Sequence, residues 1–154
     1  MTKVELREAV SGDSGFLFEV RRQAFREYVE RQEGWNESRE LERHVERLVR
    51  QRFRVIVFEG TDVGYLATAV YAVAATYPAS LYLHQLMLFP SFQSRGIGSA
   101  CIRLLSEEAH ELGIPIRLRV LRVNPRALAF YVANGCKVVS ESDSHISLEL
   151  RSSL

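Results

Sequence analysis

Hydrophobic periodicity divides the first fifty residues into one short strand and two helices. Val4 and Leu6 alternate with charged residues, which is typical of a strand, and residues 11–13 then supply turn and helix-capping chemistry. The helical spacing that follows predicts a helix as far as about Arg31, and residues 34–36 interrupt it. A second, highly charged helix is expected beyond that break, and its narrow apolar stripe consists of Leu41, Val45, Leu48 and Val49. Both helices should lie on a sheet.

Strands predominate in the rest of the chain, with two further helices between them. β-Branched, aromatic and small residues predict the strands, while glycine, asparagine and proline mark turns and helix ends. Strands are expected at 54–59, 63–74, 80–88, 116–120, 137–142 and 145–150, a tight turn at 60–62, and helices at 98–112 and from Asn124-Pro125 to 134–135. The order of strand, two helices, three strands, helix, strand, helix and two strands predicts only a mixed α/β architecture.

Composition and charge narrow the class of protein without indicating a function. A chain of 154 residues without a linker, repeat or low-complexity run predicts one domain spanning residues 1–154. Twenty basic and nineteen acidic residues give a net charge of +1, so the overall charge favours neither a nucleic-acid nor a membrane partner. The longest apolar stretch, residues 63–75, is too short to span a bilayer, and the charged first residues do not resemble a signal peptide. We therefore expect a soluble, cytoplasmic protein.

The cysteines and histidines do not suggest a metal site. Cys101 and Cys136 lie far apart without ligand spacing, so we expect free thiols rather than a disulfide or zinc ligands. His44, His110 and His145 are isolated along the chain. No metal is therefore expected.

The segment from Leu86 to Ala100 runs from a strand through a glycine-bearing loop into a helix. A helix N-terminus offers unpaired N–H groups and a partial positive charge, so a loop that brings a phosphate there forms an anion site. Gly96 and Gly98 allow such an approach, and Arg95 can add a charged contact. A tight strand-to-helix turn is the simpler alternative. The lysine of a Walker A loop and the third glycine of a dinucleotide fingerprint are both missing.

Two motifs in the C-terminal half resemble those of one enzyme family. Residues 93–98, Gln-Ser-Arg-Gly-Ile-Gly, resemble Gln/Arg-x-x-Gly-x-Gly/Ala, the pyrophosphate-binding signature of the GCN5-related N-acetyltransferase (GNAT) superfamily, and Leu86-x-Leu88-x-Pro90 resembles that family's run into the loop. Residues 124–136 resemble its pattern Asn-x-x-Ala-x-x-Phe-Tyr-x-x-x-Gly-Phe, with Cys136 in place of the usual aromatic residue. The resemblance implies an α/β (α+β) fold with a central mixed, mostly antiparallel sheet of about seven strands flanked by about four helices.

The same resemblance implies that acetyl-coenzyme A is the cosubstrate and that an amine, in a small molecule or a peptide, is the acceptor. The backbone of Leu86, Met87 and Leu88 is expected to pair with the pantetheine arm. Asn124 matches the family position that meets the pantetheine, although it can equally cap its helix, and Ala127 is a small residue that lets the cofactor approach. The pyrophosphate is expected at Gln93, Ser94, Arg95, Gly96, Ile97, Gly98 and Ser99.

Acetyl transfer in this family usually proceeds by direct attack of the amine, without a covalent enzyme intermediate. Tyr131, placed at the cofactor by the motif, matches the tyrosine that protonates the departing thiolate; the alternative is a core tyrosine. The general base is left open between His84, whose ordinary pKa is near neutrality, the carboxylates Glu33 and Glu37, and a chain of water molecules.

The acceptor pocket in such folds lies between the first two helices, the central strands and the last hairpin. Tyr28, Gln85 and His145 can reach it, and so can Trp35, which can instead fix the helix junction. Members of the family often form dimers, so a homodimer is one expectation, although no residue here specifies an interface.

Three other functions fit parts of the sequence. A non-catalytic coenzyme A-binding sensor or interaction module would keep Gly96 and Gly98 but would not need Tyr131. An enzyme of the same fold could use a hydroxyl acceptor or a longer acyl group. A nucleic-acid binder is suggested by a run of arginines, but interleaved glutamates favour a solvated helix face for Arg43, Arg47, Arg50, Arg52 and Arg54.

Overall fold

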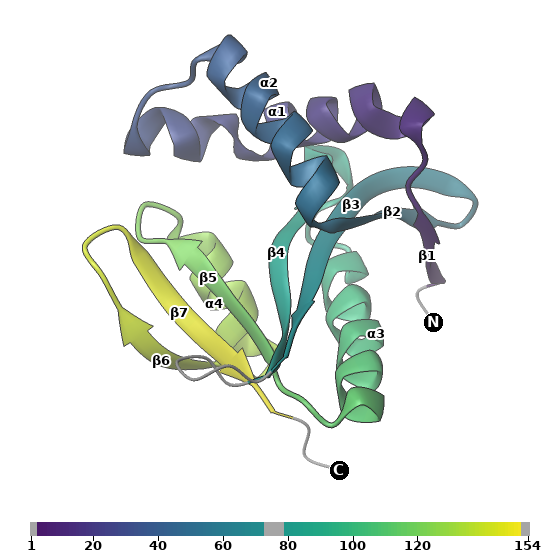
Figure 1. The fold of residues 1–154 in the computed structure, drawn as a ribbon, viewed down its shortest axis with the longest axis vertical. Helices are drawn as coiled ribbons and strands as arrows, with labels where there is room; N and C mark the ends of the chain where they lie inside the picture. Colours follow the sequence, from purple (N-terminus) through teal and green to yellow (C-terminus); the bar gives the residue numbers. More distant parts are fainter. Residues whose placement is uncertain (1–2, 73–78, 152–154) are drawn as a thin grey trace.

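The computed structural model describes residues 3–72 and 79–151, which form one seven-stranded sheet with helices on both faces (Figure 1). The strands are β1 (Val4–Glu8), β2 (Arg52–Phe58), β3 (Thr61–Tyr71), β4 (Ser80–Leu88), β5 (Ile116–Leu121), β6 (Lys137–Glu141) and β7 (His145–Leu150). The helices are α1 (Ser14–Gln32), α2 (Glu37–Arg50), α3 (Ile97–Leu112) and α4 (Pro125–Ala133), with short 3-10 turns η1 (Ser11–Asp13) and η2 (Pro90–Phe92). The expected mixed, mostly antiparallel sheet with four flanking α-helices is confirmed for these residues.

The strand order β1-β2-β3-β4-β5-β7-β6 divides the sheet into two antiparallel parts joined by one parallel pair. Strands β1 to β4 form a meander, and β5, β7 and β6 form the second part. Between them, β4 and β5 run parallel, which requires a crossover connection, and α3 supplies it. In Figure 1, β4 and β5 meet at one end and diverge toward the other.

Alternation along the strands builds one hydrophobic cluster on each face of the sheet. On β2 and β3, Ile56 and Leu66 belong to the larger cluster, which α3 and α4 cover, whereas their neighbours Val55 and Tyr65 belong to the cluster under α1. The two cysteines are free and buried, as expected. Within residues 3–72 and 79–151, no helix combines the length with the apolar character that crossing a membrane would need.

The β2–β3 hairpin corrects the predicted turn and strand limits. The turn consists of Glu59 and Gly60, both with positive φ, as a two-residue hairpin turn of this kind requires, so Thr61 and Asp62 already belong to β3. Strand β2 also begins earlier than expected, at Arg52. The predicted strand over 63–74 is described as far as Tyr71, and its last two residues lie outside the described part of the chain.

Helix α2 faces the sheet with a different side from the one its apolar stripe predicted. Leu41, Val45 and Val49 are 48%, 55% and 85% exposed, and of the stripe only Leu48 packs against the cluster under α1. The buried residues of α2 are instead Glu40 and His44. The reason lies in their partners, because His44 packs between Phe18 and Phe53 and its Nε2 lies 3.2 Å from the carbonyl oxygen of Ser14, while Glu40 meets buried Arg21. A polar cluster therefore sets the rotation of the helix.

Candidate active site

The sheet opens between β4 and β5 and so creates the principal cleft of the described molecule. The two strands pair only at Leu81–Ile116 and Tyr82–Arg117. Beyond these pairs, the edge of β4 that faces β5 does not pair with another strand. Backbone N–H and C=O groups along this edge are therefore available to a ligand. A cavity of about 1000 Å³ fills the opening and is bordered by residues of α1, α2, β4, β5, α3 and α4.

Helix α3 begins at this cleft. Gly96 is its N-cap residue and has a φ of 83°, a left-handed conformation that favours glycine. No side chain caps this end of the helix, and Gly96, Gly98 and Ser99 all line the cavity. The N–H groups of the first turn have no partner inside the helix, so this end of the cleft is suited to an anion.

Gly98 also has a packing role that the motif did not indicate. A Cβ atom at this position would lie 2.9 Å from Cζ and 3.1 Å from Cε1 of Phe130 on α4. The glycine therefore lets α3 and α4 approach each other beside the cleft. A substitution of Gly98 would disturb this packing together with any phosphate site.

The arginine that borders the anion end of the cleft is Arg126, not the predicted Arg95. Arg126 lines the cavity, and its Nη2 donates to the hydroxyl of Ser94 at 3.0 Å. The guanidinium of Arg95 instead lies over the rings of Phe58 and Phe92, at 5.3 and 5.2 Å. The side chain of Ile97 is fully buried in the core and does not line the cavity. Arg126 follows the helix-starting Asn124-Pro125, and that position at a helix N-terminus was the signal that could have identified it.

The expected pantetheine residues do border the cleft. Leu86, Met87 and Leu88 line it from β4, and the side chain of Gln93 donates to the carbonyl oxygen of Leu88 at 3.1 Å. Asn124 caps α4, because its Oδ1 accepts from the N–H of Ala127 at 3.1 Å. Its Nδ2 makes no hydrogen bond with the described chain, and Asn124 lines the same cavity, so the capping role leaves that donor available.

Tyr131 lies at the cavity wall on α4 and is 8% exposed. Burial raises the pKa of its phenol, and the neighbouring Cys136 and Cys101 contribute in the same direction. Burial also raises the pKa of Cys136 to about 11 and that of Cys101 to about 12, so both remain neutral thiols at neutral pH. The phenol therefore keeps its proton and can act as a donor.

His84 occupies a bulge in β4 and lines the cavity. Ala67 pairs with Gln85 and Thr68 with Leu83, so His84 is the extra residue without a partner on β3. Its Nε2 lies 3.0 Å from the hydroxyl oxygen of Tyr71. Burial lowers the pKa of the imidazole, and the positive charges of Arg119 and Arg47 lower it further. His84 is therefore neutral at neutral pH and able to accept a proton.

The two candidate carboxylates are both engaged by basic residues. Glu33 lines the cavity, but its carboxylate pairs with Arg43 at 2.7 Å, which contributes most to lowering its pKa. Glu37 is exposed, accepts hydrogen bonds from Trp35 and Arg22, and does not line the cavity. Of the three candidate bases, only His84 combines a place in the cleft with a free proton-accepting form.

Of the predicted acceptor residues, Tyr28, Gln85 and His145 line the cavity and Trp35 does not. The indole N–H of Trp35 donates to Glu37 at 2.7 Å, and its ring lies 6.3 Å from that of Phe18. Trp35 therefore fixes the junction of α1 and α2, the alternative role considered for it. Burial lowers the pKa of His145.

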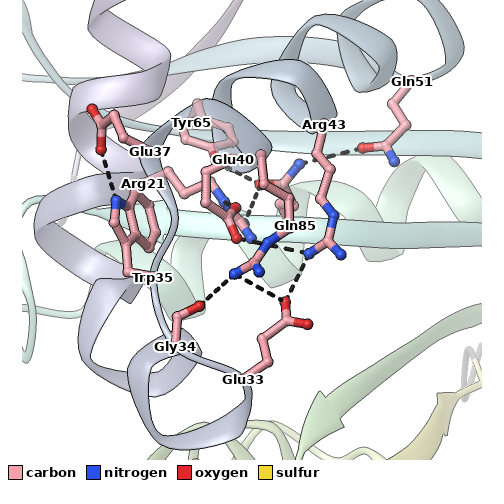
Figure 2. A network of polar contacts seen from close by, with 11 residues as sticks. Arg21, Glu33, Gly34, Trp35, Glu37, Glu40, Arg43, Gln51, Tyr65 and Gln85 are labelled. Carbon is pink, nitrogen blue, oxygen red and sulfur yellow. Dashed lines mark hydrogen bonds and ion pairs between the residues drawn. The ribbon is translucent and has the colours of Figure 1, made fainter.

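Gln85 is held in a buried polar network beneath α2 (Figure 2). Its Oε1 accepts from Nη1 of Arg21 at 3.0 Å and from the hydroxyl of Tyr65 at 2.6 Å, and its Nε2 lies 3.4 Å from Oε1 of Gln51. The Nε atom of Arg21 in turn lies 3.6 Å from the carboxylate of Glu40. Gln85 thus connects β4 to α1, to β3 and to the residue that follows α2, and its carbonyl oxygen is already occupied.

Several arginines line the cavity that the sequence did not assign to a site. They are Arg21, Arg43, Arg47, Arg119 and Arg126. The arginines between positions 43 and 54, for which a solvated helix face was favoured over nucleic-acid binding, do not share one face. Arg54 is buried against Glu108 on α3, and Arg52 pairs with Glu8 on β1. Spacing along α2 alone could not separate inward from outward arginines, because that depends on the rotation of the helix.

No group of three or more histidine, cysteine, aspartate or glutamate side chains suited to holding a metal ion occurs in the part of the chain described.

Comparison with known proteins gave a family match over residues 16–135, to the model described as the acetyltransferase (GNAT) family. Among solved structures, PH1933 from Pyrococcus horikoshii OT3 is 19% identical, with 100% of each chain covered and a TM-score of 0.78. The PaiA N-acetyltransferase from Thermoplasma acidophilum, solved in complex with coenzyme A, is 22% identical, with 97% of this chain and 99% of that chain covered and a TM-score of 0.74. An acetyltransferase from Thermus thermophilus is 18% identical, with 96% of each chain covered and a TM-score of 0.75. Curated protein sequences gave no match.

Proposed function

Because the chain belongs to the GNAT acetyltransferase family, we propose that it transfers the acetyl group of acetyl-coenzyme A to a primary amine of a small molecule or peptide. One observation carries this proposal. The cleft between β4 and β5 has an unpaired strand edge on one side and the free N-terminus of α3 at its end. This arrangement suits a ligand that is amide-bearing along its length and anionic at one end, and coenzyme A has both features.

The residues present fit that cosubstrate. The unpaired edge of β4 beyond Tyr82 would bind the amides of the pantetheine arm, and the N–H groups at the start of α3 would bind the pyrophosphate. Arg126 would add a charge beside Ser94, and the free amide nitrogen of Asn124 would donate to the arm. The PaiA structure of similar fold contains coenzyme A, which supports coenzyme A as the cosubstrate.

Acetyl-coenzyme A supplies an activated thioester, and the chain supplies positioning and proton transfer. The amine nitrogen attacks the carbonyl carbon, so a C–N bond forms and the C–S bond breaks. With Nε2–H of His84 directed at the hydroxyl of Tyr71, Nδ1 accepts the proton that the amine loses. Tyr131 gives its phenolic proton to the departing thiolate. Return of a proton from the imidazolium to the tyrosinate through solvent restores both residues.

Calorimetric titration of acetyl-coenzyme A tests the cleft without knowledge of the acceptor. Ser99 is the third residue of α3, where a glutamate is favourable for the helix but would place a negative charge at the expected pyrophosphate. We expect Ser99→Glu to fold normally and to bind acetyl-coenzyme A more weakly by roughly tenfold or more, the factor that corresponds to about 1.4 kcal/mol. The matched Ser99→Ala variant should bind like the wild type, because backbone groups hold the phosphate.

Absence of binding by well-folded wild-type protein would overturn the proposal. Binding without transfer to any amine would instead favour a coenzyme A sensor of the same fold.

A further inference from the structure

Arg47 on α2 lines the cleft without a partner for its charge. Its Nη1 atom is buried and makes no hydrogen bond, and no carboxylate of the described chain lies within ion-pair distance of its guanidinium. The neighbouring arginines differ in this respect. Arg21 donates to Gln85 and faces Glu40, and Arg43 pairs with Glu33.

The lining of the cleft is strongly cationic. It contains five arginines, and Glu33 is the sole carboxylate among the described lining residues. That glutamate is already engaged by Arg43. Arg119 likewise has no ion pair within the described chain, and it lines the cleft from β5. Two uncompensated positive charges, those of Arg47 and Arg119, therefore face the cavity from α2 and β5.

A partly buried guanidinium without a counter-ion is energetically unfavourable. Burial lowers the pKa of Arg47, and the positive charge of Arg21 adds to the effect. An anion bound beside Arg47 would relieve this penalty, whereas a second cation would increase it. A polycationic amine therefore fits this cleft poorly.

We infer that the acceptor is an amine that also carries a carboxylate, and that Arg47 binds this carboxylate. A guanidinium presents two parallel N–H groups that match the two oxygens of a carboxylate, and Arg119 lies opposite to strengthen the field. The inference rests on the proposed acetyl transfer, since the amine of the same molecule must reach His84 in the same cavity.

The rest of the lining indicates what the acceptor carries besides its charged groups. Phe25 and Tyr28 on α1 lie with their ring centroids 5.8 Å apart, and Tyr82 on β4 also borders the cavity. Aromatic surfaces of this kind bind an apolar body. An α-amino acid with an apolar side chain has all three features, namely the amine, the carboxylate and the apolar body.

Direct binding tests the inference independently of catalysis. The probes are L-phenylalanine, L-leucine and L-methionine, each compared with its α-amide, which keeps the amine and side chain but lacks the negative charge. Affinities are measured by calorimetry with and without coenzyme A. We expect at least one acid to bind about 10- to 100-fold more tightly than its amide, the range for a hydrogen-bonded charged pair. Spermidine, a polycation, should bind no more tightly than the amides.

Variants of α2 then assign the effect to one residue. Arg47→Gln keeps a polar side chain of similar reach. In this variant the acid and its amide should bind with about equal affinity. Arg50→Gln, an exposed arginine on the same helix, should leave the preference unchanged. In an acetylation assay, the loss in Arg47→Gln should appear mainly in KM for the acid.

The outcomes separate this inference from the proposed function. Equal binding of acids and amides, tighter binding of spermidine, or an acid preference that survives Arg47→Gln would each overturn the carboxylate assignment. Failure of acetyl-coenzyme A to bind would overturn the acetyltransferase proposal alone, because the acid preference is read from amino-acid binding.

Discussion

Glu40→Gln tests whether one buried carboxylate balances the arginine cluster beneath α2. Glu40 is 0% exposed, and its two oxygens make no hydrogen bond with the described chain. They lie 3.6 Å from Nε of Arg21 and 3.8 Å from Nη1 of Arg43. The substitution keeps the shape of the side chain and removes its charge, so Arg21 loses its counter-ion inside the protein.

The magnitude follows from the geometry. Removal of one member of a buried ion pair typically destabilises a protein by about 3–5 kcal/mol. The lower end, about 3 kcal/mol, is expected here, because the charged atoms are beyond hydrogen-bond distance and the side chain of Arg43 is 40% exposed. For a chain of this length, that change lowers the unfolding midpoint by roughly 6–12 °C.

The assay is urea and thermal unfolding at neutral pH, followed by circular dichroism. Glu42→Gln is the matched control, because it makes the same chemical change at an exposed position of the same helix. It should leave stability unchanged. If Glu40→Gln unfolded at the same urea concentration as this control, the reasoning that Glu40 compensates the buried arginines would be refuted.

Three further predictions concern the cleft. Tyr131→Phe should lower kcat by roughly 10²-fold, the scale of general acid catalysis, and leave the calorimetric affinity for acetyl-coenzyme A unchanged; an unaltered kcat would remove the residue from the reaction. The rate should fall as the pH drops through the pKa of His84, which burial and two arginines lower below 6.5, because the imidazolium cannot accept the amine proton. His84→Asn should lose that acidic limb in a kcat/KM profile, and a limb that persists would belong to another group. Arg126→Ala should weaken acetyl-coenzyme A binding about tenfold in calorimetry. Arg95→Ala should leave this affinity unchanged, because the guanidinium of Arg95 lies over two phenylalanine rings. The reverse ranking of the two variants would contradict the placement of the anion site.

The features of the candidate site whose local structure the sequence predicted are those set by local chain geometry. Gly96 must adopt a left-handed conformation at a helix N-terminus, and Asn124 followed by proline starts a helix wherever it occurs. Both requirements involve neighbours within a few residues. They place the start of α3 and of α4, and the strand run from Leu86 to Leu88 then falls beside them.

The parts that the sequence could not place depend on contacts between distant segments. Arg95 and Arg126 are equally basic in sequence, and they differ in contacts that include Phe58 on β2, a distant residue over whose ring Arg95 lies. Similarly, the apolar stripe of α2 is a sound amphipathic pattern taken alone. It gave the wrong face because the burial of His44 between two phenylalanine rings outweighs it.

The polar network of Figure 2 explains why α2 packs with Glu40 rather than its apolar stripe toward the sheet. The same contacts that stabilise the fold also hold the wall of the cleft at Gln85. Apolar packing tolerates small rotations of a helix, whereas the contact of Glu40 on α2 with Arg21 on α1 depends on direction, and Arg21 in turn donates to Gln85 on β4. The same network brings Arg47 to the cavity, since this residue lies two turns along α2 from Glu40. Leu41, Val45 and Val49 are then exposed, because the face of α2 that carries them cannot face the sheet at the same time as Glu40 and His44.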